Sequence, residues 1–369
     1  MFAWSWKTML KNPGRLLANA LSIASAILLV LFFDSVYRGE STQIVSYISK
    51  MKPDLWVMQK GVYNMHMATS YIWDWKADRI RKVPGVKKVT PIIYLNSVVN
   101  AGSVKSFSYI VGINPNDQRA GPWKIARGNT ISKSGEAVIP DVLSQLSGIG
   151  VGDTISIADK TLKVVGLSKG TYSVANAITF IAIDDLMDIL SASGTYSYLL
   201  VDLDKKANID KVKQKILSSV DKINVMKQQD FVKSDFKMAM QMGVEIIYIM
   251  TIICSVLAVL LIGFNAYSNL VRNRHEIAVI KALGAKNKSI LAAVLFQSLI
   301  LAGIAYGLAV IISYTLFPYV PALAPQVTVV LSSKTVEAFG VTTLIITMLG
   351  TLFPAYLALK VDPANAFKS

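Results

Sequence analysis

Four long uncharged apolar runs constrain this chain more than any other feature of its sequence. They cover residues 16–33, 246–271, 289–333 and 338–359, and none contains Asp, Glu, Lys or Arg. A helix needs about 20 apolar residues to cross the hydrocarbon core of a bilayer. The third run is too long for one span, so we expect a helix followed by a loop with Pro318, Pro321 and Pro325. The alternative for any one run, a buried core helix, does not account for four of them.

The sequence therefore predicts four transmembrane helices, at residues 16–33, 246–271, 289–317 and 338–359. The first could also be a cleaved signal peptide, because Lys7, Lys11 and Arg15 precede it. Its end carries the bulky pair Phe32 and Phe33 instead of small residues at a cleavage site, which favours an uncleaved anchor. Residues 1–15, with Trp6 among their apolar side chains, are expected to form an interfacial helix.

The distribution of basic residues predicts the orientation. Three basic residues precede the first span, five lie in the loop 272–288, and only Lys334 lies in the loop 318–337. Both termini, including the tail 360–369, and the loop 272–288 are therefore expected in the cytoplasm. Residues 34–245 would form a large domain outside. We expect a multi-pass protein of the bacterial cytoplasmic (inner) membrane.

The net charge of +15 does not require nucleic acid as a partner. Anchoring at the cytoplasmic face and scattered lysines explain much of it, so membrane lipids are the expected anionic partner. Cys254, the only cysteine, lies in the second span. The outer domain must therefore fold on its own core without an internal disulfide.

Residues 34–245 have the pattern of an α/β domain. We expect strands at 54–59, 86–99, 105–111, 136–139, 154–157, 161–165, 177–183 and 196–201, and helices at 74–83, 141–146, 184–191 and 209–220. Asp184 is the expected N-cap of its helix. Residues 50–115 and 190–228 would form one subdomain, and 130–185 a β-rich insertion. Helices over 228–242 and 44–50 would extend the second and first spans outward.

The chain lacks the motifs of several enzyme classes. It has no G-x-x-x-x-G-K-[ST] loop, no H-E-x-x-H and no G-x-S-x-G. We therefore expect no cofactor in this chain and no metal site. Met65, His66 and Met67 are candidates for a substrate or soft-metal ligand, which Met238, Met240 and Met242 would extend. The alternative is a set of apolar contacts.

The loop 272–288 is the most informative short segment. Glu276 suits the positive start of a short helix, and Gly284 suits its end. Ile277, Ile280 and Leu283 would form one apolar stripe, with Lys281 beside it. By composition alone, a helix resting on the membrane surface is an equally good interpretation.

Residues 275–285, H-E-I-A-V-I-K-A-L-G-A, resemble the R-E-I-G-[IV]-x-[RK]-A-[LVM]-G-A signature of FtsX-like permeases, the MacB, DevC, LolC/E or HrtB type of ABC transporter. The ending Pro354-Ala355…Val361-Asp362-Pro363 is similar to the end of that family. The order of one span, a large outer domain and three spans also matches. His275, Ala278 and Asn365 depart from the usual arginine, glycine and glutamate.

The resemblance implies a permease with a MacB-like periplasmic core that transmits motion across the membrane. Two copies of a separate cytoplasmic ATPase would bind ATP and Mg and dock on Glu276, Ile277, Ile280, Lys281, Leu283 and Gly284. A second permease copy, identical or homologous, is expected, and a periplasmic adaptor is a further candidate partner. Export or extraction of a hydrophobic or amphipathic substrate is the leading interpretation. The alternatives are a non-transporting regulator of a partner such as a cell-wall hydrolase, and a membrane-anchored enzyme.

Overall fold

The computed structural model describes residues 6, 10–174 and 177–359. It divides into a helical unit (Met1–Arg38, Ile246–Val320 and Val329–Ser369) and an outer domain (Gly39–Glu245 and Pro321–Thr328). Most of the predicted interfacial helix and the whole tail 360–369 lie outside the described residues.

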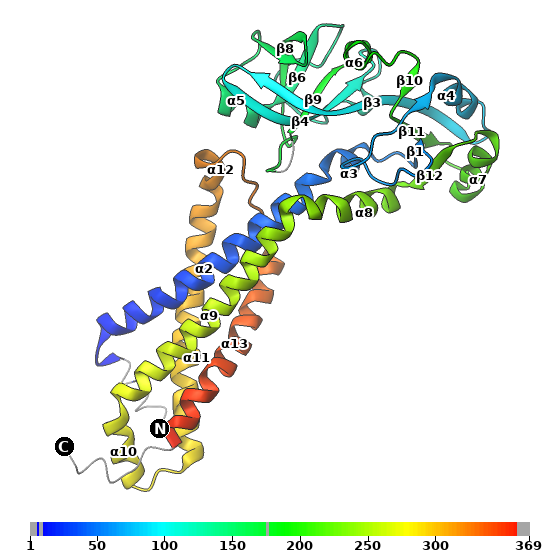
Figure 1. Cartoon of the computed structure of the whole chain (residues 1–369). Coiled ribbons are helices and arrows are strands. Elements are labelled where there is room, and N and C mark those ends of the chain that lie inside the picture. Colours follow the sequence, from blue (N-terminus) through cyan, green and yellow to red (C-terminus); the bar gives the residue numbers. More distant parts are fainter. Residues whose placement is uncertain (1–5, 7–9, 175–176, 360–369) are drawn as a thin grey trace. The chain divides into compact units, whose positions relative to one another are not determined.

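The helical unit contains the four predicted spans. The helices that are long and apolar enough to cross a membrane are α2 (Pro13–Ile44), α9 (Glu245–Arg272), α11 (Asn287–Leu316, continuing through η3, Phe317–Tyr319, and α12, Val320–Leu323) and α13 (Ser333–Leu359). Figure 1 shows α9, α11 and α13 running alongside one another, and α10 (Arg274–Ala282) connecting α9 to α11. Ile23, Ile262 and Leu301, from α2, α9 and α11, share one buried cluster.

Both spans that lead to the outer domain are longer as helices than their apolar runs. The helix α2 continues past residue 33 to Ile44, and a separate short helix α3 (Ser46–Met51) follows after Val45. The predicted extension over 44–50 is therefore broken at Val45. At the other junction, α8 (Gln228–Ala239) passes into α9 through a π-helical turn, η2 (Met240–Val244).

The outer domain is built on a ten-stranded mixed sheet with the order β12-β1-β11-β3-β4-β9-β6-β8-β5, in which β7 pairs with β3 and β8. The pairs β4–β9 and β6–β8 are parallel, and the others are antiparallel. A separate two-stranded sheet pairs β2 with β10. The strands are β1 (Leu55–Gln59), β2 (Ile72–Trp73), β3 (Val86–Ala101), β4 (Val104–Ile113), β5 (Ile125–Gly128), β6 (Glu136–Pro140), β7 (Thr154–Ile157), β8 (Lys160–Ser168), β9 (Ala177–Ala182), β10 (Thr195–Tyr196), β11 (Tyr198–Leu203) and β12 (Ile223–Lys227).

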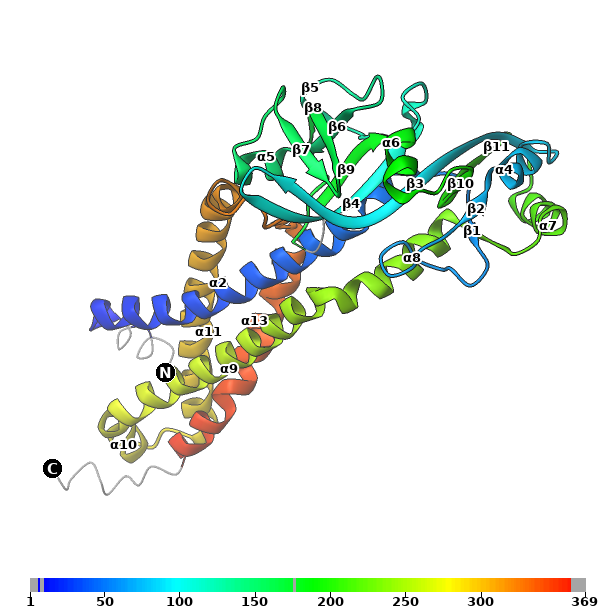
Figure 2. The same ribbon diagram turned by 45° about the horizontal axis from the view of Figure 1, so that its top comes forward.

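The long hairpin β3–β4 joins the two predicted subdomains into one sheet. The first part of β3 pairs with β11, and its second part pairs with β4 and β7. Figure 2 shows these two strands crossing the domain. The two predicted subdomains therefore share one sheet, because the second part of β3 and the strand β4, both assigned to the first subdomain, pair with strands of the insertion 130–185. Each of the two regions has its own hydrophobic cluster.

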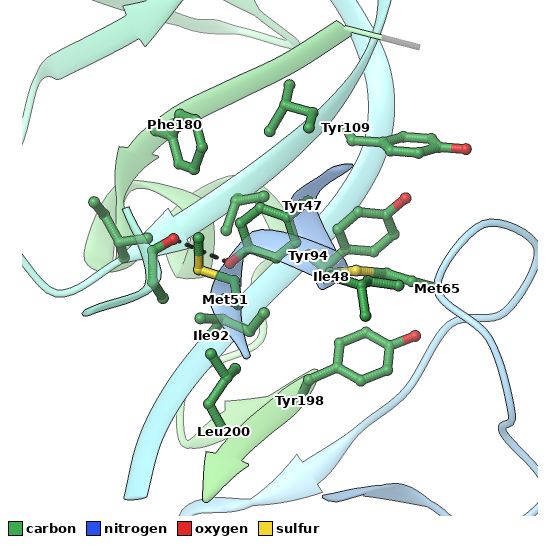
Figure 3. Close-up of a cluster of buried hydrophobic side chains, with 14 of the residues drawn as sticks. Tyr47, Ile48, Met51, Met65, Ile92, Tyr94, Tyr109, Phe180, Tyr198 and Leu200 are labelled. Atoms are coloured by element: carbon green, nitrogen blue, oxygen red, sulfur yellow. Dashed lines mark hydrogen bonds between the residues drawn. The ribbon is translucent and has the colours of Figure 1, made fainter. Parts of the chain in front are cut away.

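Strand β1 is buried on both faces, which explains its continuous apolar sequence. Leu55 and Val57 pack with α4 (Asp74–Arg81) and α7 (Ile209–Ser219), whereas Trp56 and Met58 pack in the cluster that includes α3 and α8. Figure 3 shows part of that second cluster, in which aromatic side chains gather around α3. The Tyr47 hydroxyl donates a hydrogen bond of 3.0 Å to the carbonyl of Ala120, so this buried phenol is satisfied.

The remaining helices of the domain are α5 (Asp141–Ser147), α6 (Ile183–Leu190) and the short η1 (Gln118–Ala120). Asp184 was predicted as the N-cap of α6, but the helix begins at Ile183, and Ala182 stands at the cap position. Asp184 and Asp185 lie in the first turn, where the partial positive charge of the helix favours them. The sequence analysis also missed β2, β5 and β12, and merged β10 and β11, which are separated at Ser197.

Candidate functional site

The connection between α9 and α11 folds as the helix α10, close to its predicted position. Glu276 lies in its first turn, although Asn273 at the N-cap makes no side-chain capping hydrogen bond. Gly284 has φ +90°, a left-handed conformation that residues with a side chain rarely adopt. The backbone N–H of Ala285 then donates to the carbonyl of Ile280 at 3.2 Å, which closes the helix end as expected for a glycine there.

The predicted apolar stripe of α10 divides into an inward and an outward part. Ile277 is only 4% exposed and packs with Leu270, Ile290, Val294 and Ala355 of the helical unit. Leu283 is 82% exposed, and Ile280 is half-buried. Ile277 therefore anchors the helix in its own bundle and is not available to a partner, which corrects its expected role in docking. The three residues differ because α10 packs on α9, α11 and α13, a contact that the local pattern does not encode.

Polar residues of α10 differ in surroundings as well. Glu276 lies 3.6 Å from the ammonium of Lys11, which brings the segment before α2 next to α10. Lys281 is half-buried, and Gly284 is exposed. The sequence analysis missed Val279, which is 40% exposed. Together with Leu283 it offers apolar surface at the end of the bundle.

The Met65, His66 and Met67 segment has a structural role in the outer domain. His66 is buried, and its Nδ1 lies 2.6 Å from Oδ2 of the fully buried Asp235 in α8. The other oxygen of Asp235 accepts hydrogen bonds from the backbone N–H groups of Met65, at 2.6 Å, and His66, at 3.2 Å. One carboxylate thus fastens this loop to α8. No sequence signal distinguished Asp235 from the other acidic residues of the chain.

These three residues do not converge on one ligand position. Met65 is buried with His66, whereas Met67 is exposed. Across residues 10–174 and 177–359, no group of three or more His, Cys, Asp or Glu side chains is arranged to hold a metal ion. The Met-His-Met segment is therefore better explained by packing and by the bond to Asp235 than by metal binding.

A second buried carboxylate, missed by the sequence analysis, belongs to Glu40 near the end of α2. It is 1% exposed and accepts hydrogen bonds from the backbone N–H groups of Val174, at 2.8 Å, and Thr328, at 2.7 Å. The neighbouring Gly39 needs to lack a side chain, because a Cβ there would collide with the Thr328 carbonyl. Within the outer domain, Glu40 therefore ties two loops to the last turns of α2.

Comparison with known proteins identifies two family domains in this chain. Residues 16–219 match the MacB-like periplasmic core domain, and residues 248–363 match the FtsX-like permease C-terminal domain. Similar curated proteins include two uncharacterized ABC transporter permeases of Mycobacterium tuberculosis, each 20% identical and covering 96% of this chain and 95% of its own length. An uncharacterized ABC transporter permease of Methanocaldococcus jannaschii is 28% identical over 160 residues, which are 41% of this chain and 39% of that protein.

Among solved structures, the periplasmic region of MacB from Actinobacillus actinomycetemcomitans aligns with a TM-score of 0.41 at 10% identity, covering 52% of this chain and 96% of that one. The extracellular domain of the transporter YknZ from Gram-positive bacteria aligns with a TM-score of 0.38 at 12% identity, covering 47% and 98%. The first family match alone covers more than half of the chain, and the second covers the last three spans. This chain belongs to the MacB/FtsX-type permeases of ABC transporters and is a multi-pass membrane protein with a large α/β outer domain.

Proposed function

We propose that this permease couples ATP hydrolysis by a cytoplasmic ATPase to movement of its outer domain, for the export or extraction of a hydrophobic or amphipathic substrate. The observation that carries the proposal is the two-sided helix α10. Ile277 and Ala278 are buried in the bundle, whereas Val279 and Leu283 are exposed. A helix anchored on one side and apolar on the other is suited to receive a partner and pass its motion to α9 and α11.

ATP and Mg would be bound by the partner, because this chain has no P-loop. Since an ATP-driven cycle of this type uses paired ATPase subunits, we propose two ATPase copies with two permease chains, either identical or homologous. An adaptor outside the membrane could extend the route of the substrate. We place the assembly in the bacterial inner membrane, with the termini and α10 in the cytoplasm and residues 34–245 outside.

The coupling role is tested by Leu283→Asp. A charge placed in a buried apolar contact costs several kcal/mol if it stays unpaired, so we expect at least a tenfold loss of ATPase co-purification and of stimulated ATP turnover. The matched control is Leu323→Asp in α12, another highly exposed leucine, 88% exposed, on the proposed outer side. The control should retain ATPase binding and turnover.

If Leu283→Asp retains normal ATPase binding and turnover, α10 is not the coupling element. Ile280→Asp is expected to give a smaller loss, because Ile280 is half-buried and contributes less surface. Ile277→Asp is unsuitable for this test, since it would place a charge in the core of the bundle itself.

The orientation is tested by single cysteines at two exposed asparagines, Asn129→Cys and Asn287→Cys, in a Cys254→Ser background. In intact cells an impermeant maleimide should label position 129 and not position 287. Both should react after the membrane is permeabilised. The reverse labelling pattern in intact cells would contradict the proposed topology.

A further inference from the structure

A polar pocket lies within the helical unit among α2, α9, α10 and α11, at the proposed cytoplasmic end of the bundle. Most of its lining side chains are polar although three of these helices are predicted spans. The lining consists of Lys11, Asn12, Arg15, Leu16, Asn19, Ile23, Ile262, Asn265, Ala266, Asn269, Asn273, Glu276, Gln297, Ser298 and Leu301. These amides carry no charge and therefore do not interrupt the uncharged runs from which the spans were predicted.

Carboxamides inside a bundle of spans need a reason, because each brings two N–H donors and a carbonyl acceptor into an apolar surrounding. Asn265 and Gln297 are both buried. Asn265 donates one N–H to the carbonyl of Leu261, at 2.9 Å in its own helix, and a second N–H and an acceptor remain in the same side chain. A hydroxyl has only one O–H to satisfy: Ser313, for example, donates it to the Ala309 carbonyl at 2.7 Å, the same kind of bond within one helix.

The lining changes in order along two helices. On α2 it passes from Arg15 through Asn19 to Ile23, a rise of about 12 Å at 1.5 Å per residue. On α9, which runs the opposite way, it passes from Asn269 through Asn265 to Ile262. The helix α2 therefore presents a charged end, a carboxamide level and an apolar level, and α9 presents two carboxamides followed by an apolar level. A phospholipid has the same order, with a phosphate, ester carbonyls and acyl chains.

The charge and the size of the pocket favour a phosphate. Lys11 and Arg15 contribute two positive charges and Glu276 one negative charge, so the lining carries a net charge of +1. The pocket encloses about 80 Å³, which exceeds several times the 10–15 Å³ that one water requires. That space accepts a phosphate group with its bridging waters.

We propose that this pocket binds the phosphate of an anionic phospholipid from the surrounding leaflet. Arg15 and Lys11 contact the phosphate, the amides of Asn265 and Asn269 donate to the ester carbonyls, and the acyl chains leave along the apolar level. Because Lys11, Arg15 and Glu276 all line the pocket, the bound headgroup also holds the segment before α2 against α10. The inference takes the orientation from the proposed function.

The test titrates phosphatidylglycerol into the purified, delipidated full-length permease and counts bound lipid by native mass spectrometry. We expect one tightly held lipid per chain, bound about fivefold more weakly by Arg15→Gln, as for the loss of one basic contact near the headgroups. Asn269→Leu should also weaken lipid binding, although it leaves every charge of the pocket in place. The control is Lys288→Gln, which removes an exposed basic residue that does not line the pocket.

Three results would overturn the proposal. Equal losses in Arg15→Gln and Lys288→Gln would indicate general attraction to basic residues, and no loss in Arg15→Gln and Asn269→Leu would remove the pocket from lipid binding. Displacement of the lipid by millimolar inorganic phosphate would assign the pocket to the free ion. ATPase co-purification with wild type and Leu283→Asp is measured in parallel, so that a failure of the coupling role is seen separately from a failure of lipid binding.

Discussion

The outer domain and the helical unit bury different kinds of side chain. In the outer domain the large apolar residues Trp56 and Phe180 are fully buried. In the helical unit Leu260 and Phe264 are 61% and 66% exposed, whereas Thr347 and Thr351 are fully buried. The outer domain thus follows the pattern expected in water, and the helical unit follows the pattern expected in lipid.

The two units also satisfy their buried polar groups in different ways. Within the bundle, Thr347 donates to the Thr343 carbonyl at 2.7 Å, and Thr351 donates to the Thr347 carbonyl at 2.5 Å. These bonds close within one helix and need no partner helix. In the outer domain, His66 and Asp235 satisfy each other over a separation of 169 residues. These threonines of the bundle are thus satisfied by local hydrogen bonds, whereas the buried pair of the outer domain is satisfied by the tertiary fold.

The largest expected effect is the loss of a core aromatic in the outer domain. Trp56 packs on Phe231, with ring centroids 4.9 Å apart, and donates to Gln228 Oε1 at 2.6 Å. Trp56→Ala should lower the free energy of unfolding of this domain by about 3–5 kcal/mol, measured by pulse proteolysis in nanodiscs. Phe264→Ala, at an exposed position of α9, is the control and should change it little. Equal losses in both variants would mean that the two units do not differ in this way.

A charge on the lipid-facing surface of the bundle should have the next largest effect. Leu260→Arg places a guanidinium near the middle of α9, where insertion of the helix should cost about 2.5–3.5 kcal/mol more. The inserted fraction is measured by alkaline extraction of membranes. In the outer domain, Leu146→Arg in α5, also at an exposed leucine, should leave that fraction unchanged. Normal insertion of Leu260→Arg would contradict a lipid-facing position.

The third prediction concerns pH and the buried Asp185 of the outer domain. Burial by itself would raise the pKa of this carboxyl, but hydrogen bonds from Lys160 Nζ, Ser134 and Gly135, together with the charge of Lys160, outweigh it and hold the pKa below its ordinary value. Asp185→Asn should cost the domain about 1.5–3 kcal/mol at neutral pH. Asp188→Asn, an exposed partner of the same lysine, should cost much less.

Because the pKa of Asp185 is lowered on folding, its contribution is fully present above the unfolded pKa of about 4 and is lost as the pH falls through the folded value. The difference in stability between wild type and Asp185→Asn should therefore shrink below about pH 4. Burial by itself would lower the pKa of Lys160, but the hydrogen bonds that its ammonium donates to Asp185 and Asp188, together with their charges, outweigh it and raise the pKa. The contribution of Lys160 to stability should stay constant from pH 5 to 9. A stability difference between wild type and Asp185→Asn that grows in acid would refute this account.

The smallest of these effects should come from a close contact between α9 and α13. A Cβ at Gly263 would lie 3.2 Å from the carbonyl oxygen of Gly350. Gly263→Val should therefore separate the two helices and cost about 1–3 kcal/mol, read from the thermal stability of the solubilised protein. Gly303→Val in α11 is the matched control, since a Cβ there meets nothing within 4 Å. A larger loss at Gly303 than at Gly263 would place the close contact elsewhere.

Features that depend on neighbouring residues could be predicted from the sequence. The length of each uncharged run located the four spans, because a helix in lipid must satisfy its backbone internally over a fixed thickness. Alternation and turn residues located strands such as β6 and β7, and Glu276 and Gly284 located the ends of α10. The motif at residues 275–285 also indicated the family, which the comparisons confirm.

Which of these features contact one another depends on tertiary packing and could not be predicted from local sequence. It paired β4 with β9 in parallel and joined the two predicted subdomains through β3. It turned Ile277 inward and Leu283 outward, although both are aliphatic residues of one short segment. It also gathered the amides of three spans around one pocket. A local pattern records which side chains avoid water or need a hydrogen bond, but the partner that satisfies each one lies far along the chain and is selected only by packing.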